Sequence, residues 1–184
     1  MTMRKASQLL ALLSTLLLYP LANAGTEIAF DDARGLETIS GEFFKPEGDG
    51  PFPAIVMLHG CDGIRDYHHA WANTFTEWGY IAFMVDSLGP RGVEETCENP
   101  FSISPELRQL DALGALQTLR KRKDVIADRV AVAGWSHGGW TALKGVSKNG
   151  MWRYTDNLPG GTFKTAVTIY PYCVTPAFFV SPVQ

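Results

Sequence analysis

A serine placed between two glycines is the residue of this sequence best suited to covalent chemistry. The segment reads Gly134-Trp135-Ser136-His137-Gly138, after the apolar run 130–133 and before a predicted helix over 138–147. A serine hydroxyl becomes an effective nucleophile when a base takes its proton and nearby donors stabilise the oxyanion that forms. Glycines at these two positions permit the tight strand-to-helix turn that raises such a serine above a sheet. The motif therefore predicts a nucleophile at Ser136.

The residues that would assist this serine are scarce in the rest of the sequence. After Ser136 there is one histidine, His137, within the motif itself, and one acidic residue, Asp156. Where a serine on a strand–turn–helix motif works in a triad, the acid and the histidine follow it in chain order. We therefore expect low activity or none from this chain alone.

A second loop is predicted to complete a site for an oxyanion. It follows the apolar run 54–58 and reads His59-Gly60-Cys61-Asp62-Gly63. In folds with this serine motif, one backbone donor follows the serine and the other comes from such a loop. We expect the backbone N–H groups of Cys61 and His137 to be these donors, and a simple glycine turn is the alternative for the loop.

The elements that would position these loops alternate between strand and helix. Continuous apolar runs predict strands that are buried on both faces of a parallel sheet. A helix over 67–78 is predicted from helical spacing, with Ala70, Trp71, Phe75 and Trp78 on its buried face. A second helix should begin at Pro105 with Ser104 as its cap. The predicted strands are 27–30 and 37–44, of antiparallel type, followed by 54–58, 80–85, 130–133 and 165–170. This alternation indicates an α/β fold with a mostly parallel sheet flanked by helices.

The first 24 residues have the features of a secretory signal peptide. Arg4 and Lys5 precede the apolar run 9–18, and Ala22-Asn23-Ala24 is a small-x-small cleavage site. Ten apolar residues are too few to span a bilayer comfortably, so an uncleaved anchor is the less favoured alternative. We expect cleavage after Ala24, a secreted or periplasmic protein without stable membrane insertion, and one domain over 25–184.

Charge and residue spacing argue against several classes of partner. Without Arg4 and Lys5 the chain would carry 14 basic and 19 acidic residues, a net charge of −5. A mildly acidic chain without a basic face gives no support for a nucleic-acid partner. No group of His, Cys, Asp or Glu has metal-ligand spacing, and no glycine-rich phosphate loop occurs. We therefore expect neither a metal nor a cofactor.

Three cysteines remain for an oxidising compartment, namely Cys61, Cys97 and Cys173. Two of them can pair there, and one is left over. We favour the pair Cys61–Cys97, because both residues are expected in loops above the same edge of the sheet. Free cysteines are the alternative.

Three segments together resemble the dienelactone hydrolase family of the α/β-hydrolases. They are LHGCDG at 58–63, the stretch 70–97, and RVAVAGWSHGGW at 129–140. The resemblance covers roughly 44–172. It implies an α/β-hydrolase fold and hydrolysis of a carboxylic ester or lactone, without a cofactor, by a Ser or Cys nucleophile, an Asp and a His. By resemblance Ser136 is the nucleophile, and Cys61 and His137 supply the oxyanion N–H groups.

The sequence departs from the family pattern at its C-terminal end. The family continues with a strand that bears the Asp and a later loop that bears the His, and Ser181-Pro182-Val183 resembles the start of that strand. We expect a sheet that lacks its C-terminal strands, impaired catalysis, and self-association through the open sheet edge. Two alternatives are a non-catalytic binding or assembly protein whose edge is completed by a partner, and a partial sequence.

Other residues could in principle replace the absent base or bind the substrate. His59, His68, His69 and Asp86 could act as a base or orient one, although a structural role is the simpler interpretation of each. Arg91, in the segment Gly-Pro-Arg-Gly, could bind a substrate carboxylate, and a solvated arginine is the alternative.

Overall fold

The computed structural model describes residues 25–146 and 161–172. The predicted signal peptide, Asp156, Cys173 and the segment 181–183 lie outside these residues. Within the described ranges, no helix is both long and apolar enough to cross a membrane.

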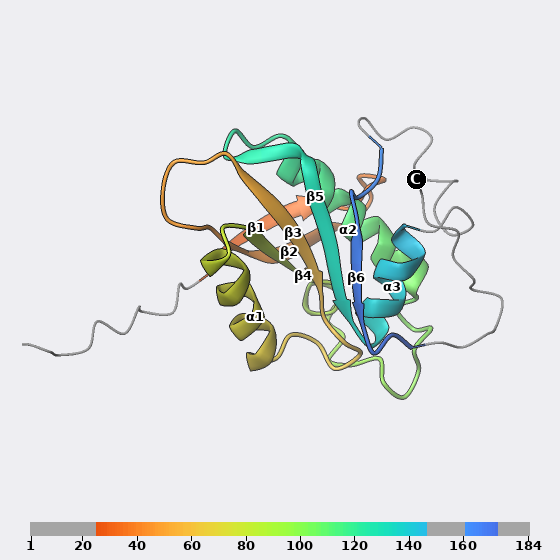
Figure 1. Cartoon of the computed structure of the whole chain (residues 1–184). Helices are drawn as coiled ribbons and strands as arrows, with labels where there is room; N and C mark the ends of the chain where they lie inside the picture. Colours follow the sequence, from red (N-terminus) through yellow and green to blue (C-terminus); the bar gives the residue numbers. More distant parts are fainter. Residues whose placement is uncertain (1–24, 147–160, 173–184) are drawn as a thin grey trace, which may run out of the picture.

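Six strands in these ranges form one sheet, and helices connect them (Figure 1). The strands are β1 (Thr26–Asp31), β2 (Thr38–Phe44), β3 (Phe52–Leu58), β4 (Ile81–Asp86), β5 (Val125–Trp135) and β6 (Ala166–Ile169). The helices are α1 (Asp66–Glu77), the short 3-10 helix η1 (Gly89–Arg91), α2 (Pro105–Arg120) and α3 (His137–Gly145). Every predicted strand and helix is present, with β5 extending well before the predicted 130–133.

The strand order is β1-β2-β4-β3-β5-β6. Strand β2 runs antiparallel to both β1 and β4, whereas β4, β3, β5 and β6 pair in parallel. Parallel strands joined through helices give the α/β architecture that the sequence predicted.

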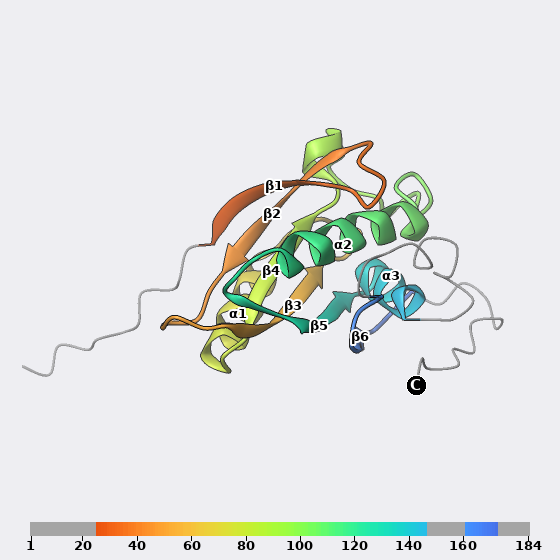
Figure 2. The same cartoon turned by 90° about the horizontal axis from the view of Figure 1, so that it is seen from above.

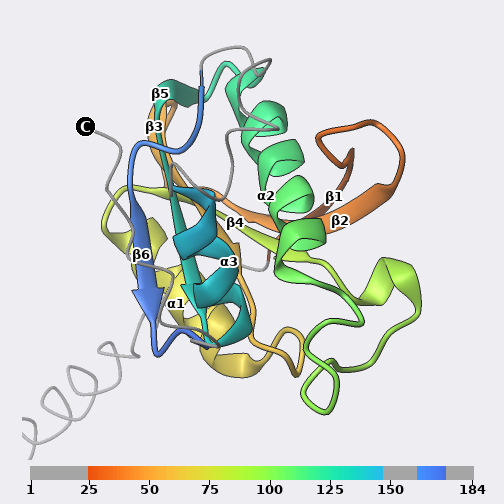
Figure 3. The same ribbon diagram turned by 90° about the vertical axis from the view of Figure 1, so that its right-hand side faces the viewer.

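Alternating side chains divide the core into two layers on opposite faces of the sheet. Val56 and Leu58 of β3 pack in one apolar cluster, with Leu113 of α2, while Met57 packs in the other, with Phe75 of α1. The period of two along a strand sends successive side chains to opposite faces. Helix α1 therefore covers one face, and α2 and α3 cover the other (Figures 2 and 3).

Helix α1 shows where the predicted periodicity was wrong. Its buried residues are His68, Ala72 and Phe75, whereas Trp71 and Trp78 are exposed. An amphipathic pattern made of large aromatic residues did not identify the buried stripe, because a histidine occupies part of it.

The parallel strands all end at one edge of the sheet, at the lower end of β5 and β6 in Figure 1. The loop after β3, the long loop 87–104 after β4 and the turn between β5 and α3 follow this edge. In open α/β sheets, ligands bind at the carboxyl ends of the strands. The predicted nucleophile and the predicted oxyanion loop therefore lie together at the carboxyl ends of the parallel strands, where such sites form.

Candidate active site

Ser136 occupies a strained turn between the end of β5 and the start of α3. Its backbone angles are φ 51° and ψ −113°. A residue other than glycine in this region costs about 1–3 kcal/mol, so surrounding contacts must hold it. The Ser136 N–H donates to the carbonyl of Ile169 at 3.0 Å, and its carbonyl accepts from Trp140 at 2.9 Å and Tyr172 at 3.1 Å. These bonds fix the backbone of the predicted nucleophile.

The two glycines of the motif make the turn sterically feasible. A Cβ at Gly134 would lie 2.2 Å from the carbonyl oxygen of Gly138. A Cβ at Gly138 would lie 2.1 Å from the carbonyl oxygen of Leu58. Real Cβ atoms do not approach backbone so closely, so the turn requires both glycines.

The loop after β3 lies directly against this turn. A Cβ built at Gly60 would be 3.9 Å from the Cβ of Ser136. The carbonyl of the next residue, Cys61, accepts from the Thr96 N–H at 2.8 Å, and its sulfur is bonded to Cys97. The predicted Cys61–Cys97 disulfide is thus confirmed, and it ties the loop after β3 to the loop after β4.

The two backbone donors that the sequence predicted are both unoccupied within the described residues. Neither the Cys61 N–H nor the His137 N–H donates a hydrogen bond there. The His137 N–H also opens helix α3, where the helix dipole favours negative charge. Their assignment as oxyanion donors remains a prediction.

The His137 side chain is poorly placed to act as a base, because both of its ring nitrogens already have hydrogen-bond partners. Nδ1 accepts from the Arg108 guanidinium at 2.8 Å, which leaves Nε2 to donate to the carbonyl of Pro100 at 2.7 Å. Burial, together with the adjacent Arg108 charge, lowers the pKa of His137 to about 4. The imidazole is therefore neutral at physiological pH and structural in its contacts.

His59 is also fully engaged. Its Nδ1 donates to the carbonyl of Gly60 at 2.6 Å, and its Nε2 accepts from the Ser87 N–H at 3.3 Å. Burial and the nearby Arg108 charge hold the pKa of His59 well below its ordinary value. These hydrogen bonds hold the start of the loop after β3 against the start of the loop after β4.

The two histidines of α1 have local partners as well. His68 Nδ1 accepts from the Arg65 N–H at 2.9 Å and its ring packs edge-on against Trp135, while burial lowers its pKa to about 4. His69 Nε2 lies 3.0 Å from a carboxylate oxygen of Glu42. All four histidines of the chain are thus placed, and in the part of the chain that the structure describes none bonds to the Ser136 hydroxyl.

Asp86 stabilises a turn. One of its carboxylate oxygens accepts from the backbone N–H groups of Leu88 and Gly89, at 3.0 and 2.8 Å. The same oxygen is 4.0 Å from His59 Nε2. The structural alternative considered for Asp86 matches these contacts.

Arg91 lies in η1 within an ion-pair network. Its guanidinium makes two bonds of 2.8 Å to the buried Asp111, and it also bonds Glu37 and the carbonyl of Ser87. Burial acts to lower the pKa of Arg91, but the bonds to these two carboxylates raise it. To bind a substrate carboxylate Arg91 would have to leave these partners, so its proposed substrate contact stays a prediction.

Arg108 is the residue of this site that sequence reasoning missed. Its side chain is fully buried, and it contacts both His137 and the carbonyl of His59. An arginine in a helix is ordinarily read as a surface residue. The available signal was its helical spacing, because Ala112 and Ala115 follow it at i+4 and i+7 on the buried face of α2.

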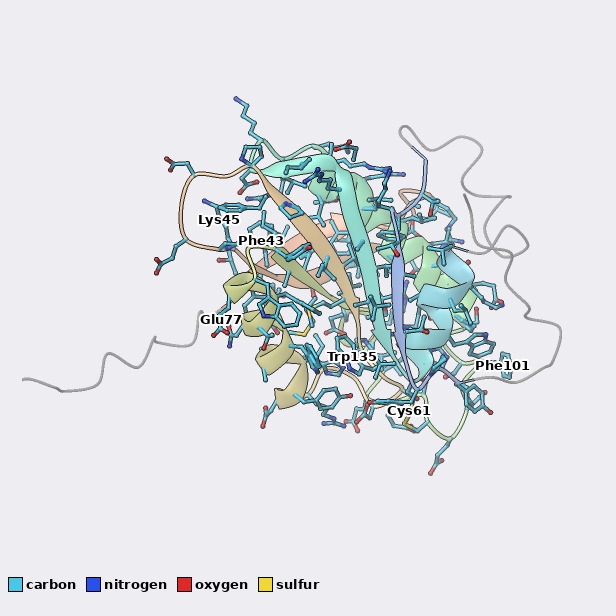
Figure 4. The ribbon with its side chains drawn as sticks, viewed as in Figure 1. Phe43, Lys45, Cys61, Glu77, Phe101 and Trp135 are labelled. Carbon is cyan, nitrogen blue, oxygen red and sulfur yellow. A yellow bond between two sulfur atoms is a disulfide. The ribbon has the colours of Figure 1, made fainter. Side chains whose placement is uncertain are left out.

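Aromatic rings flank the turn on two sides. Trp135 packs with Tyr67 and Trp71 of α1, and Trp140 of α3 packs edge-on with Phe101 and Tyr172. Figure 4 shows Trp135, Cys61 and Phe101 at the end of the sheet where β5 and β6 end. No group of three metal-ligating residues occurs within the described ranges.

Comparisons with known proteins agree with this fold. The model of the dienelactone hydrolase family matches residues 39–175. The chain is similar to the solved structure of m3DLH, with 29% identity and a TM-score of 0.55 over 67% of this chain and 53% of that one. It is also similar to a dienelactone hydrolase-like promiscuous phosphotriesterase from metagenomic libraries, with 25% identity and a TM-score of 0.50 over 65% and 53% of the two chains.

A curated relative adds a shorter match. The esterase FrsA of Klebsiella pneumoniae is 36% identical over 53 residues, which are 28% of this chain and 13% of that protein. The chain thus spans about half the length of the two solved structures and a much smaller share of the esterase.

Proposed function

Because this chain belongs to the dienelactone hydrolase family, we propose that it derives from an enzyme that hydrolyses a carboxylic ester or lactone, with Ser136 as the nucleophile. One observation supports the proposal more than any other. Ser136 occupies a strained backbone position at φ 51°, beside a loop whose Cys61 N–H is unoccupied. Strain of this kind persists where function requires it.

The proposed reaction uses the two loops in one step. The Ser136 Oγ attacks the carbonyl carbon and loses its proton to solvent, a C–O bond forms, and the carbonyl π electrons move to the oxygen. The backbone N–H groups of Cys61 and His137 would stabilise that oxyanion. Collapse breaks the bond to the leaving alcohol, which takes up a proton, and water then releases the acid from the acyl-serine.

We propose further that turnover by this chain alone is slow. The four histidines bind Gly60, Arg65, Glu42 and Arg108, and among the described residues none of them is hydrogen-bonded to the Ser136 hydroxyl. Preorganised oxyanion donors and binding alone can still leave roughly 10³-fold acceleration over water. Acylation should therefore be measurable even though steady-state turnover is low.

The test is a pre-steady-state assay with a short-chain nitrophenyl ester. We expect the purified chain to release about one nitrophenolate for each chain and then to turn over slowly. Ser136→Ala should release none. The matched control is Ser102→Ala, which alters a serine on the exposed loop after β4 and should behave as the wild type. Release that is unaffected by Ser136→Ala would rule out Ser136 as the nucleophile.

Steady-state turnover decides the second part of the proposal. Ordinary enzymes turn over at about 1–10³ s⁻¹. A rate in that range that depends on Ser136 would overturn the proposal of slow turnover and would require a base that the described contacts do not supply.

A non-catalytic binding or assembly role is the second candidate. Strand β6 pairs with β5 on one side, and among the described residues no strand pairs with its other side. Unpaired strand edges favour association. A defined dimer or complex in light scattering, with no nitrophenolate burst, would favour this second function over the first.

A further inference from the structure

A single buried arginine connects the two loops of the candidate active site. Arg108, on α2, donates from one terminal nitrogen to the carbonyl of His59 at 2.7 Å and from the other to Nδ1 of His137 at 2.8 Å. His59 lies two residues before Cys61 in the loop after β3. His137 itself carries the other proposed donor on its backbone. The planar guanidinium therefore bridges the two segments that supply the oxyanion donors.

The bonding of this arginine is unusual for a fully buried cation. Buried charges are normally paired with an opposite charge, because an isolated buried ion is costly. Arg108 forms no ion pair with a carboxylate within the described residues, and its Nε has no hydrogen-bond partner there. Asp111 of the same helix, whose charge acts on Arg108, binds Arg91 instead.

The charge persists under physiological conditions. Burial lowers the pKa of Arg108 to about 10, with Asp111 acting in the opposite direction. The guanidinium is therefore protonated at neutral pH. A cation bonded to the two segments that carry these donors makes the potential at their N–H groups more positive, because charges interact strongly in a low-dielectric interior.

We propose that Arg108 is a positioning residue for the oxyanion site, which holds the Cys61 and His137 N–H groups in register and adds positive potential behind them. This role rests on the proposed function, since it presupposes attack by Ser136. The side chain fits this role, since one that only filled space would need neither the planar fork nor the charge.

Two variants separate geometry from charge. Arg108→Lys keeps a positive charge but loses the planar fork that spans both acceptors. Arg108→Met keeps an unbranched side chain and loses both charge and fork. The matched control is Gln109→Met on the same helix, since Gln109 is equally buried and its side chain has no hydrogen-bond partner among the described residues.

The probe is ethyl 4-nitrophenyl methylphosphonate, which reacts once with the serine. The Ser136 Oγ forms a bond to phosphorus, the P–O bond to nitrophenolate breaks, and the serine proton passes to solvent. The tetrahedral adduct places an oxygen where the oxyanion would lie. The saturation rate and the half-saturation concentration are measured separately, with thermal unfolding and hydrogen exchange of the segments 59–63 and 135–140.

For Arg108→Met we expect the saturation rate to fall about 10- to 100-fold, with the half-saturation concentration within about twofold of wild type. Exchange in the two segments should rise, Arg108→Lys should be intermediate, and Gln109→Met should match wild type. The proposal would be overturned if Arg108→Met lost rate and labelled fraction equally, in proportion to the unfolded population alone. It would also be overturned if folded Arg108→Met were labelled at the wild-type rate.

A measurement on the wild type keeps the proposal testable if Arg108→Met does not fold. Nitrogen-15 NMR of the imidazoles should show His137 neutral, with its proton on Nε2 and a bare Nδ1 that accepts from Arg108. A proton on Nδ1 would overturn the proposal. Failure of the proposed function would give a different result. Wild type and Ser136→Ala would then be equally unreactive toward the phosphonate, while His137 kept this tautomer. In that case Arg108 would have no role in catalysis either.

Discussion

The α-carbon of Gly138 lies so close to the carbonyl of Leu58 that a Cβ at position 138 would be 2.1 Å from that oxygen. Leu58 ends β3 and precedes the loop that carries Cys61, whereas Gly138 lies in the first turn of α3. The close approach therefore sets the distance between the serine turn and the oxyanion loop.

Gly138→Ala should separate these two segments and destabilise the protein. We expect the free energy of unfolding to fall by at least about 3 kcal/mol, because backbone on both sides must move. Gly35→Ala is the control: Gly35 has φ +69° but open space around it, so only about 1 kcal/mol should be lost. Denaturant unfolding of both variants checks the difference, and equal losses would contradict a steric role for Gly138.

As pH is lowered, the free energy of unfolding should begin to decrease at a higher pH than titration of the carboxylates alone would cause. His68 and His137 have pKa values lowered to about 4 by burial, and burial also lowers the pKa of His59. Folding thus favours their neutral forms. Their contribution is complete above the unfolded pKa of about 6.5 and is lost as pH falls from there toward 4.

Thermal unfolding between pH 7.5 and 3.5 measures this effect. Asp32 and Asp124 have lowered pKa values, so their stabilisation is lost only at lower pH, around and below 4. We expect a decline that begins near pH 6.5. A melting temperature that is constant down to pH 4.5 would show that the three histidines are not held neutral.

Removal of either partner of the Arg91–Asp111 pair should be costly. Asp111 is fully buried and receives two bonds from Arg91. We expect Asp111→Asn to lower the free energy of unfolding by about 3 kcal/mol, with strong coupling in a double-mutant cycle with Arg91→Met. Arg65→Met, which breaks an exposed pair with Asp62, should cost less than about 1 kcal/mol. If Asp111→Asn and Arg65→Met lowered the free energy of unfolding by similarly small amounts, Arg91 would be weakly held and able to bind a substrate carboxylate.

The disulfide should stabilise the fold as well as the loop after β3. Its cysteines are 36 residues apart, for which chain entropy gives a stabilisation of about 2–4 kcal/mol. Cys97→Ala keeps Cys61 in the loop but removes the crosslink. Reductant should lower the melting temperature of the wild type and leave that of Cys97→Ala unchanged. An identical response of the two proteins to reductant would contradict the bond.

The sequence was sufficient for the parts of the molecule that depend on local pattern. Continuous apolar runs located the four strands that pair in parallel, and Ser104 caps α2 through its hydroxyl as predicted. The glycine spacing around Ser136 also predicted the strained turn, because few other backbones fit that motif. Loop placement favoured the pair Cys61–Cys97 but left free cysteines open, and the structure decides for the disulfide.

The sequence was insufficient where function depends on contacts between distant segments. The bond from Arg108 to the carbonyl of His59 joins residues 49 positions apart, and that to His137 joins residues 29 apart. No periodicity signals such a contact, and a charged residue is expected at the surface. Contacts between distant segments also explain why the sequence pattern predicted Trp71, and not His68, on the buried face of α1.

The most direct test of the account is the site of covalent labelling. The purified chain is incubated with ethyl 4-nitrophenyl methylphosphonate, weighed intact, and digested to locate the adduct. The account predicts one methylphosphonyl ester group per chain, on the peptide that contains Ser136, and none on Ser136→Ala. An unlabelled wild type, or an adduct on another residue that persists in Ser136→Ala, would contradict the assignment of Ser136 as the nucleophile.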